Sequence, residues 1–126
     1  MFRLYNLGVM KWTVFFSQAV TDWLDSVDEE TYELFQAAVK VLGEEGPSLG
    51  RPLVDRVKHS KIHNLKELRP GSTGRSEIRA LFVFDPKRQA IILVIGDKSG
   101  QWDEWYKVAL PQTEEMYEKY LRGEEI

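Results

Sequence analysis

The sequence has no cysteine, which excludes disulfide bonds and metal sites built on thiolates. It has only two histidines, His59 and His63, and no carboxylate joins them in a metal-binding motif such as HExxH. The glycine-containing segment 71–74 lacks the Lys-Ser or Lys-Thr pair that completes a phosphate-binding P-loop. We therefore expect neither a metal site nor a cofactor.

Long apolar runs are also missing. None approaches the roughly 18 residues that a membrane-crossing helix requires. Residues 1–10 lack the continuous apolar centre and the small-residue cleavage site of a signal peptide. A length of 126 residues is typical of one domain. The sequence thus predicts a cytoplasmic protein without a membrane partner, with one domain over 1–126 in which residues 1–11 form an unassigned N-terminal extension.

Acidic residues outnumber basic ones, but the basic residues are concentrated in one segment. The chain carries 17 Lys and Arg against 20 Asp and Glu, a net charge of −3. Residues 51–79 hold eight Lys and Arg and only three Asp and Glu, whereas the segments on either side are net negative. This asymmetry fits a local anionic partner, and it fits equally a solvated basic loop in an acidic protein.

The first half of the sequence predicts a strand followed by two helices. Residues 12–16 are rich in β-branched and aromatic side chains, which is typical of a strand. Ser17 and Asp28 are of types that favour the N-cap position, so each can begin a helix, and Pro47 prevents the second helix from continuing. Apolar residues spaced by three and four follow both caps. These residues are Val20, Trp23, Leu24 and Val27 in the first helix, and Leu34, Phe35, Ala38, Val41 and Leu42 in the second.

The second half predicts three antiparallel strands and a last helix. Residues 47–61 have the composition of a loop, and strands are expected at 65–69, 76–84 and 89–95. The third strand is apolar on both faces, so it belongs in the centre of a sheet. Pro111 is expected to open a C-terminal helix. The order of elements predicts an α+β fold, in which an N-terminal strand and a helical hairpin pack on a small twisted antiparallel sheet, followed by a C-terminal helix.

Cations and polar aromatic side chains gather around these strands. Alternation along 76–84 places Arg75, Glu77 and Arg79 on the face opposite Ile78 and Ala80, and Leu81 and Val83 make that same face apolar near the end of the strand. Guanidinium and ammonium groups bind phosphates and stabilise charge that develops at phosphorus, and aromatic rings give bases a surface for stacking. The candidates are Lys61, His63, Lys66, Arg69, Arg75, Arg79, Lys98, Trp102, Trp105 and Tyr106.

Each of these residues also has an ordinary structural interpretation. Arg69 and Arg79 can pair with neighbouring glutamates across strands, which is common in sheets. Trp102 is of a residue type that more often anchors a core, and His63 can be a hydrogen-bonding loop residue. For any single residue this interpretation is the more frequent one. The residues by themselves therefore predict an α+β domain with a basic sheet face that can bind an anion.

Four segments look like a family signature in their order and spacing: GPSLGRPLVD at 46–55, HNLKELRPG at 63–71, GRSEIR at 74–79 and GDKSG at 96–100. They resemble the HigB-like, phage-derived branch of the RelE/ParE toxin superfamily of type II toxin–antitoxin systems. The resemblance covers about residues 12–122, and the progression LKELR, RALFVF and GDK is specific to this branch. It implies a RelE-like fold.

The resemblance implies a toxin that inhibits translation as a ribosome-dependent, metal-independent messenger RNA endoribonuclease. In such enzymes the 2′-hydroxyl of the RNA attacks its own 3′-phosphate, while basic side chains hold the phosphate and a polar group moves protons. The implied partners are the ribosome, messenger RNA and a cognate helix-turn-helix antitoxin. Because the antitoxin reads the operator DNA in this branch, no specific DNA binding by the chain itself is expected.

The resemblance also implies roles for particular residues. Arg79, which precedes the apolar run of its strand, is the first catalytic candidate. Lys66 and Arg69 are expected to hold the RNA backbone, and His63 or Tyr106 is expected to transfer the proton. The expected RNA-binding residues are Lys61, Arg75, Lys98 and Trp102.

Two other functions remain open on the same fold. The ParE branch binds DNA gyrase without cutting RNA, so a non-enzymatic gyrase inhibitor is one alternative, and fold analogy does not separate the two. A non-toxic protein-binding remnant is the other. The basic hairpin with Lys66, Arg69 and Arg79 favours the nuclease, because a protein-binding mode need not gather cations there.

Overall fold

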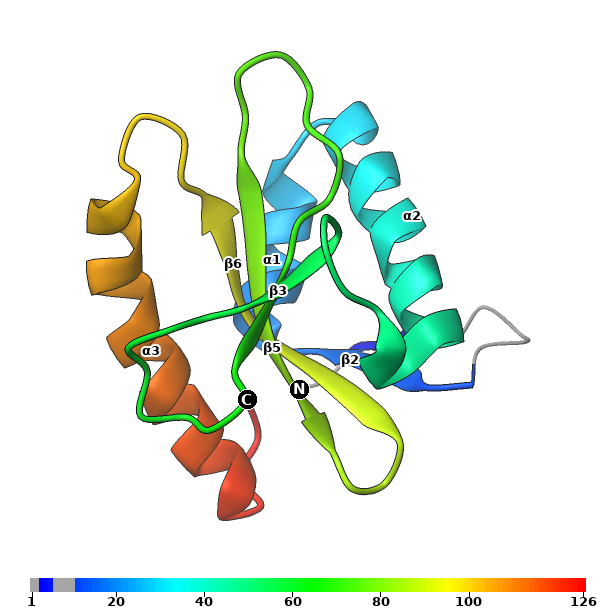
Figure 1. The fold of residues 1–126 in the computed structure, drawn as a ribbon, viewed down its shortest axis with the longest axis vertical. Coiled ribbons are helices and arrows are strands. Elements are labelled where there is room, and N and C mark those ends of the chain that lie inside the picture. The colour runs from blue at the N-terminus through cyan, green and yellow to red at the C-terminus, as the bar shows by residue number, and fades with distance from the viewer. Residues whose placement is uncertain (1–2, 6–10) are drawn as a thin grey trace.

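The computed structural model describes residues 3–5 and 11–126. Six strands form one sheet in the order β1-β2-β6-β5-β4-β3 (Figure 1). No helix in these residues is long and apolar enough to cross a membrane. The elements are β1 (Arg3–Tyr5), β2 (Thr13–Phe16), α1 (Gln18–Ser26), α2 (Glu29–Glu45), the short 3-10 helix η1 (Gly46–Ser48), β3 (Val54–Arg56), β4 (Lys66–Leu68), β5 (Ile78–Asp85), β6 (Gln89–Asp97) and α3 (Asp103–Leu121).

The predicted α+β fold is confirmed, with one correction to the sheet. Strands β4, β5 and β6 are antiparallel neighbours, as expected. The N-terminal strand β2, however, runs parallel to β6, so the sheet is mixed and not purely antiparallel. The chain between β2 and β6 contains the helical hairpin and three further strands, which is long enough for the crossover that parallel pairing needs, whereas the short connections between β4, β5 and β6 require antiparallel pairing.

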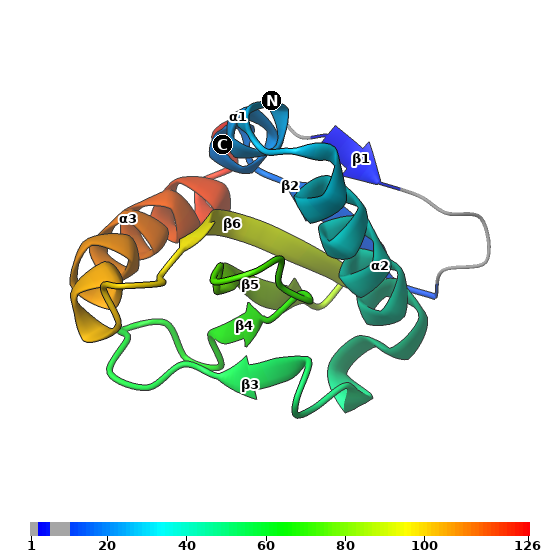
Figure 2. The same ribbon diagram turned by 90° about the horizontal axis from the view of Figure 1, so that it is seen from above.

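The sheet has a hydrophobic core on each face. Helices α1 and α2 cover one face and α3 covers the other, as Figure 2 shows from above. Strand β5 supplies both cores by alternation, with Ala80 and Phe82 on the side of the helical hairpin and Leu81 and Val83 on the side of α3. Strand β6 is buried along almost its whole length, which explains why its sequence is apolar on both faces.

The helical hairpin begins at the predicted caps. The Ser17 hydroxyl accepts the backbone N–H of Val20 at 3.2 Å, and the Asp28 carboxylate accepts that of Thr31 at 3.0 Å. Each contact satisfies one of the N–H groups that a helix leaves open at its start.

Three elements differ from the sequence prediction. Helix α3 begins at Asp103, and Pro111 lies inside it. Asp103 is followed by Glu104, and acidic residues suit the positive end of a helix, whereas the exposed Pro111 only removes one internal hydrogen bond. The predicted loop contains the short strand β3, and the unassigned extension contains β1, paired with β2. The remainder of the extension before residue 11 lies outside the described residues.

Candidate active site

Three elements direct polar side chains to the face of the sheet that α3 covers. Glu67 of β4 lies opposite Leu81 of β5, which belongs to the α3-side core. Arg69 lies two residues after Glu67, and Arg79 lies two residues before Leu81, so alternation places both arginines on that same face. Tyr106 reaches the same place from the beginning of α3. Glu67, Arg69, Arg79 and Tyr106 form what we call the Glu67 cluster.

A buried carboxylate lies at the centre of the Glu67 cluster. Glu67 is only 3% exposed. Its Oε2 accepts a hydrogen bond from Arg69 Nε at 2.7 Å, and its Oε1 accepts one from the Tyr106 hydroxyl at 2.5 Å. Arg79 Nε lies 3.7 Å from the same Oε2. The carboxylate is therefore shared by two guanidinium groups, and Asp55 beside Arg69 and Glu77 beside Arg79 supply the remaining negative charge.

Arg79 has an unused hydrogen-bond donor. Its Nη1 donates to the carbonyl of Ile78 at 2.9 Å, and its Nη2 lies 3.8 Å from Glu77 Oε1. The buried Nε has no hydrogen-bond partner in the described part of the chain. An unmet buried donor is costly, so this N–H favours any acceptor that is brought within hydrogen-bond distance of it.

Lys98 and Trp102 extend the cluster toward the end of β6. The Lys98 side chain is 10% exposed, and its Nζ lies 4.0 Å from Glu77 Oε1. The same ammonium lies 4.4 Å from the ring centre of Trp102, within the range of a cation–π contact. Trp102 is 61% exposed and has a φ of 45°, an uncommon conformation for a bulky residue. A large ring is thus held at the surface beside buried positive charge.

Gly96 explains how the start of α3 comes so close to the sheet. The indole of Trp105 lies over Gly96, and a Cβ added to Gly96 would stand 2.7 Å from its Nε1 atom. The neighbouring Tyr106 packs edge-on against Trp105, with ring centres 5.0 Å apart. Close approach at this glycine therefore positions the tyrosine that reaches Glu67.

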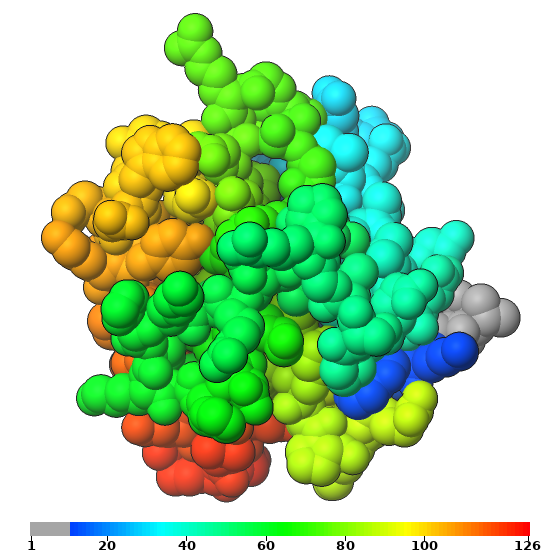
Figure 3. Space-filling view, in the orientation of Figure 1, coloured from blue at the N-terminus to red at the C-terminus, as the bar shows by residue number. Residues whose placement is uncertain are grey.

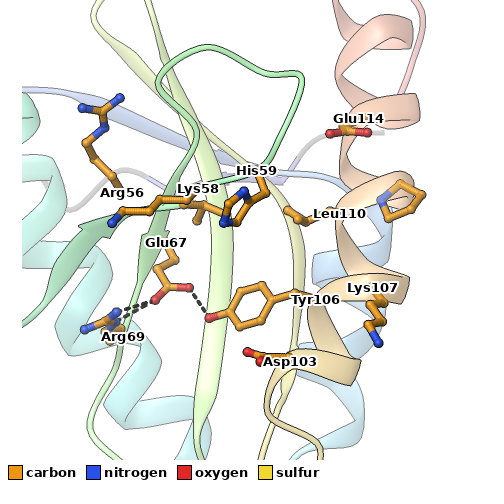
Figure 4. A pocket seen from close by; sticks show the side chains of 12 residues that line it. Arg56, Lys58, His59, Glu67, Arg69, Asp103, Tyr106, Lys107, Leu110 and Glu114 are labelled. Atoms are coloured by element: carbon orange, nitrogen blue, oxygen red, sulfur yellow. Dashed lines mark hydrogen bonds and ion pairs between the residues drawn. The ribbon is translucent and has the colours of Figure 1, made fainter.

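A cavity of about 570 Å³ opens beside the Glu67 cluster. Glu67, Arg69 and Tyr106 contribute to its lining, as do Lys58 and His59 from the loop after β3. Figure 4 shows the Glu67 carboxylate between Arg69 and Tyr106, with Arg56 and Lys107 directed away from it. The space-filling view shows the teal and green residues of this region between orange α3 and cyan α2 (Figure 3). The cavity is large enough for part of a nucleotide chain.

The loop over the cavity is tied to α3 by one carboxylate. Glu114 Oε2 accepts hydrogen bonds from the Ser60 hydroxyl and from the backbone N–H of Lys61, each at 2.8 Å. The bond from the Lys61 N–H is the largest effect and lowers the pKa of Glu114 against the opposing effect of burial, and the bond from Ser60 lowers it further. The carboxylate is therefore ionised at neutral pH and holds the wall formed by residues 57–61.

Electrostatics keep Tyr106 protonated and Arg69 charged. Burial raises the pKa of Tyr106 above its usual value, and the hydrogen bond to Glu67 adds to the effect. For Arg69, burial lowers the pKa, but the hydrogen bond and the charge of Glu67 outweigh it and raise the pKa overall. At neutral pH the cluster thus offers a phenol proton and two guanidinium charges around a carboxylate.

The structure separates the predicted site residues into groups. Arg69, Arg79, Lys98, Trp102 and Tyr106 lie in or next to the Glu67 cluster. His63 and Lys66 line a different cavity, although both were predicted to be catalytic. Lys61 and Arg75 are exposed, and Lys61 contacts Glu114 only through its backbone. Among residues 3–5 and 11–126, no three His, Cys, Asp or Glu side chains are grouped so that they could hold a metal ion.

Sequence reasoning missed the part that Glu67 plays. It treated the residue only as a possible ion-pair partner for Arg69. The available signal was its position two residues before Arg69, which puts both side chains on one strand face. That Arg79 and Tyr106 meet the same carboxylate depends on strand register and helix docking, which local patterns do not reveal.

Comparisons with known proteins agree with the sequence resemblance. The family model described as "Phage derived protein Gp49-like" matches residues 22–118. The candidate toxin HigB2 of Mycobacterium tuberculosis (strain ATCC 25618 / H37Rv) is 54% identical over 104 residues, which are 82% of this chain and 52% of that protein. The candidate toxin HigB3 of the same organism is 44% identical over 105 residues, or 83% of this chain and 90% of that protein.

The chain therefore spans about half the length of the HigB2 relative and most of HigB3. No solved structure is significantly similar to it. The predicted resemblance to phage-derived, HigB-like proteins is confirmed. The chain belongs to the Gp49-like family of phage-derived proteins.

Proposed function

We propose that this protein is the toxin of a toxin–antitoxin pair and that it cleaves messenger RNA on the ribosome without a catalytic metal. Its similarity to HigB2 and HigB3, which are named as candidate toxins, supports the first part. The observation that carries the second part is the buried carboxylate of Glu67 shared by Arg69, Arg79 and Tyr106 beside an open cavity.

In this proposal the two arginines hold the scissile phosphate. The Arg69 side chain is 32% exposed and lines the cavity, so it has donors within reach of an anion. The Arg79 side chain is 15% exposed, and a small movement of it would present its buried N–H, which makes no hydrogen bond, to the same anion. Guanidinium groups match phosphate oxygens in geometry and stabilise the extra charge that forms on them during attack. Loss of one such donor costs about 10²–10³ in rate in well-studied enzymes.

Glu67 and Tyr106 move the protons. The Glu67 carboxylate accepts the proton of the 2′-hydroxyl while the O2′–P bond forms, and the P–O5′ bond breaks. Tyr106 gives its proton to the departing 5′ oxygen. The existing hydrogen bond between Tyr106 and Glu67 then returns the first proton to the phenol, so the site ends in its starting state. The products are a 2′,3′-cyclic phosphate and a 5′-hydroxyl end.

Trp102 is suited to stacking on a base next to the cleaved bond. Its ring is largely exposed, and the ammonium of Lys98 lies against it. Base–aromatic stacking contributes about 1–3 kcal/mol per base and tolerates any sequence. We expect Trp102→Ala to weaken RNA binding by about tenfold or more, while Trp102→Phe retains most of the affinity.

An antitoxin would inhibit this protein by covering the Glu67 cluster or the adjacent sheet edge at β3. A helix-turn-helix protein encoded beside the toxin is the expected partner. Co-expression followed by affinity purification of this chain tests the expectation, because a stable complex should co-purify. A neighbouring gene product that never binds would oppose it.

The proposed function is tested by inducing the protein in a bacterial host and mapping messenger RNA ends by primer extension. Arg79→Ala should abolish growth arrest and new ends, whereas Arg122→Ala, which removes an exposed arginine outside the site, should not. Circular dichroism establishes that both variants fold. Growth arrest with intact messenger RNA and poisoned gyrase would refute the nuclease and support a gyrase inhibitor.

A further inference from the structure

A second cavity, of about 350 Å³, lies where β4 begins and β5 ends. His63, Asn64 and Lys66 line it from β4 and the turn before it, and Phe84 and Tyr117 line it from β5 and α3. Figure 1 shows the end of β5 at the lower end of the molecule and the yellow loop between β6 and α3 at the top, and the two cavities share no lining residue among those described. This cavity is therefore separate from the Glu67 cluster.

The strand geometry keeps the two sites apart. Leu65 belongs to the α3-side core and Glu67 faces the same side, so Lys66 between them faces the other way. Lys66 pairs in register with Phe82, whose ring lies in the core under the helical hairpin. Without a change in strand register, Lys66 cannot join the Glu67 cluster.

The polar side chains of this cavity are unmatched. In the Glu67 cluster, Arg69 and Arg79 each lie within about 4 Å of a carboxylate oxygen, and so does the neighbouring Lys98. Lys66 is half-buried, yet within residues 11–126 its ammonium has no ion pair and no hydrogen bond. The side chains of His63 and Asn64 are exposed and make no hydrogen bond to a described residue, so their donors face solvent at the mouth of the cavity.

The cavity has no acidic lining in a chain that is acidic overall. None of its lining residues is Asp or Glu, although the chain has 20 of them. An ammonium, an imidazole, a carboxamide and a phenol can all donate hydrogen bonds into the same space. Such a set, with a net positive charge and no carboxylate, suits an anion with several oxygen atoms.

We propose that this second cavity binds a phosphate group of an RNA strand, with Lys66 supplying the charge and His63 and Asn64 supplying hydrogen bonds. The inference rests on the proposed function to the extent that RNA is the source of the phosphate. RNA is favoured over an acidic protein because the rings of Phe84 and Tyr117 adjoin the donors and aromatic rings are a common stacking surface for bases. The bound phosphate is a different one from the phosphate at the Glu67 cluster.

The first part of the test uses inorganic phosphate as the probe. NMR spectra of the full-length protein are recorded during a phosphate titration for the wild type, Lys66→Gln and Lys40→Gln. Lys40 is an exposed lysine of α2 and serves as the matched control. We expect saturable shifts at residues 63–66 in the wild type and Lys40→Gln, and their loss in Lys66→Gln. No shift at these residues in the wild type would overturn the proposal.

The second part measures the salt dependence of binding to a short single-stranded RNA. Removing one phosphate contact should reduce the slope of log K against log salt by about 0.7, which is the value for a single strand. We expect this reduction for Lys66→Gln and no change for Lys40→Gln. Phosphate shifts without any effect of Lys66→Gln on RNA binding would overturn the assignment to RNA and point to an acidic protein partner.

These readouts do not depend on cleavage. A wild-type protein that never cleaves RNA, but binds it with a slope that falls in Lys66→Gln, would refute the nuclease and leave the phosphate cavity in place. Normal cleavage by the wild type, with a salt slope that Lys66→Gln leaves unchanged, would refute the phosphate cavity and leave the nuclease in place.

Discussion

Replacing Glu67 by glutamine removes the central charge of the cluster and keeps its shape. In Glu67→Gln, Arg69 retains Asp55 at 3.1 Å as an ion-pair partner, and Arg79 retains only Glu77 at 3.8 Å. A hydrogen bond to a charged group contributes about 1.5–3 kcal/mol when it is buried. Because the Arg69 side chain is 32% exposed, we discount its loss to about 1 kcal/mol.

The Arg79 contact is longer, at 3.7 Å, but better buried, and we assign it about 1 kcal/mol as well. Glu67→Gln should therefore lower the free energy of unfolding by about 2 kcal/mol, measured by urea denaturation at pH 7. RNA cleavage should fall much further, by about 10²–10⁴, because the proton acceptor is gone. Cleavage is compared under conditions in which both proteins are folded.

Asp55→Asn is the matched control. Asp55 also contacts Arg69 and lies across from Glu67 in the sheet, but it does not contact Tyr106. We expect a loss of stability of about 1 kcal/mol or less and little change in cleavage. Wild-type cleavage by Glu67→Gln would refute the role of the carboxylate. Equal losses of activity in both variants would mean that only the position of Arg69 matters.

Three further changes test the surroundings of the cluster. The pKa of Tyr106 is raised in the folded state, so the unfolded chain loses the phenol proton first as the pH rises. The free energy of unfolding should therefore fall above about pH 10, by up to about 1.4 kcal/mol per pH unit for this residue. Tyr106→Phe should make this fall shallower when unfolding by urea is measured at several pH values. Gly96→Ala should destabilise the protein by about 1–3 kcal/mol and alter tryptophan fluorescence, because the new Cβ displaces Trp105; an unchanged melting temperature would contradict the packing described. Glu114→Gln should lower the free energy of unfolding by about 1 kcal/mol at pH 7 and accelerate hydrogen exchange at the Lys61 amide. Because the pKa of Glu114 is lowered in the folded state, the wild type should lose this stability as the pH falls through that pKa. Equal exchange rates in the two proteins at pH 7 would argue against the hydrogen bond between Glu114 and the Lys61 amide.

Local patterns account for the parts of the fold that were predicted. Ser17 and Asp28 act through atoms three residues away, and the apolar stripes of α1 and α2 repeat within single helices. The beginning of α3 was missed because Pro111 is a stronger sequence signal than the residues around Trp102, whose backbone conformation depends on docking. The strands β1 and β3 have three residues each, too few for an alternating pattern to be recognised, whereas the equally short β4 was marked by the Pro70-Gly71 turn signal that follows it.

The candidate site was predictable in its residue types but not in its arrangement. Alternation along β5 placed Arg79 on the correct face. The same rule, applied to β4, separates Lys66 from Arg69 because they are three residues apart. The contact between Glu67 and Tyr106 joins residues 39 positions apart and depends on how α3 packs on the sheet. Such a contact leaves no local signal in the sequence.

The chemistry of the cut ends tests the central claim most directly. Purified protein is added to translating ribosomes carrying a defined messenger RNA, with Glu67→Gln and Arg79→Ala beside it. The account predicts new fragments with 2′,3′-cyclic phosphate and 5′-hydroxyl ends. Wild-type protein should make these fragments even after EDTA has removed any bound metal from it, and neither variant should make them. Fragments with 5′-phosphate ends, or no cleavage by a folded wild-type protein on translating ribosomes, would contradict it.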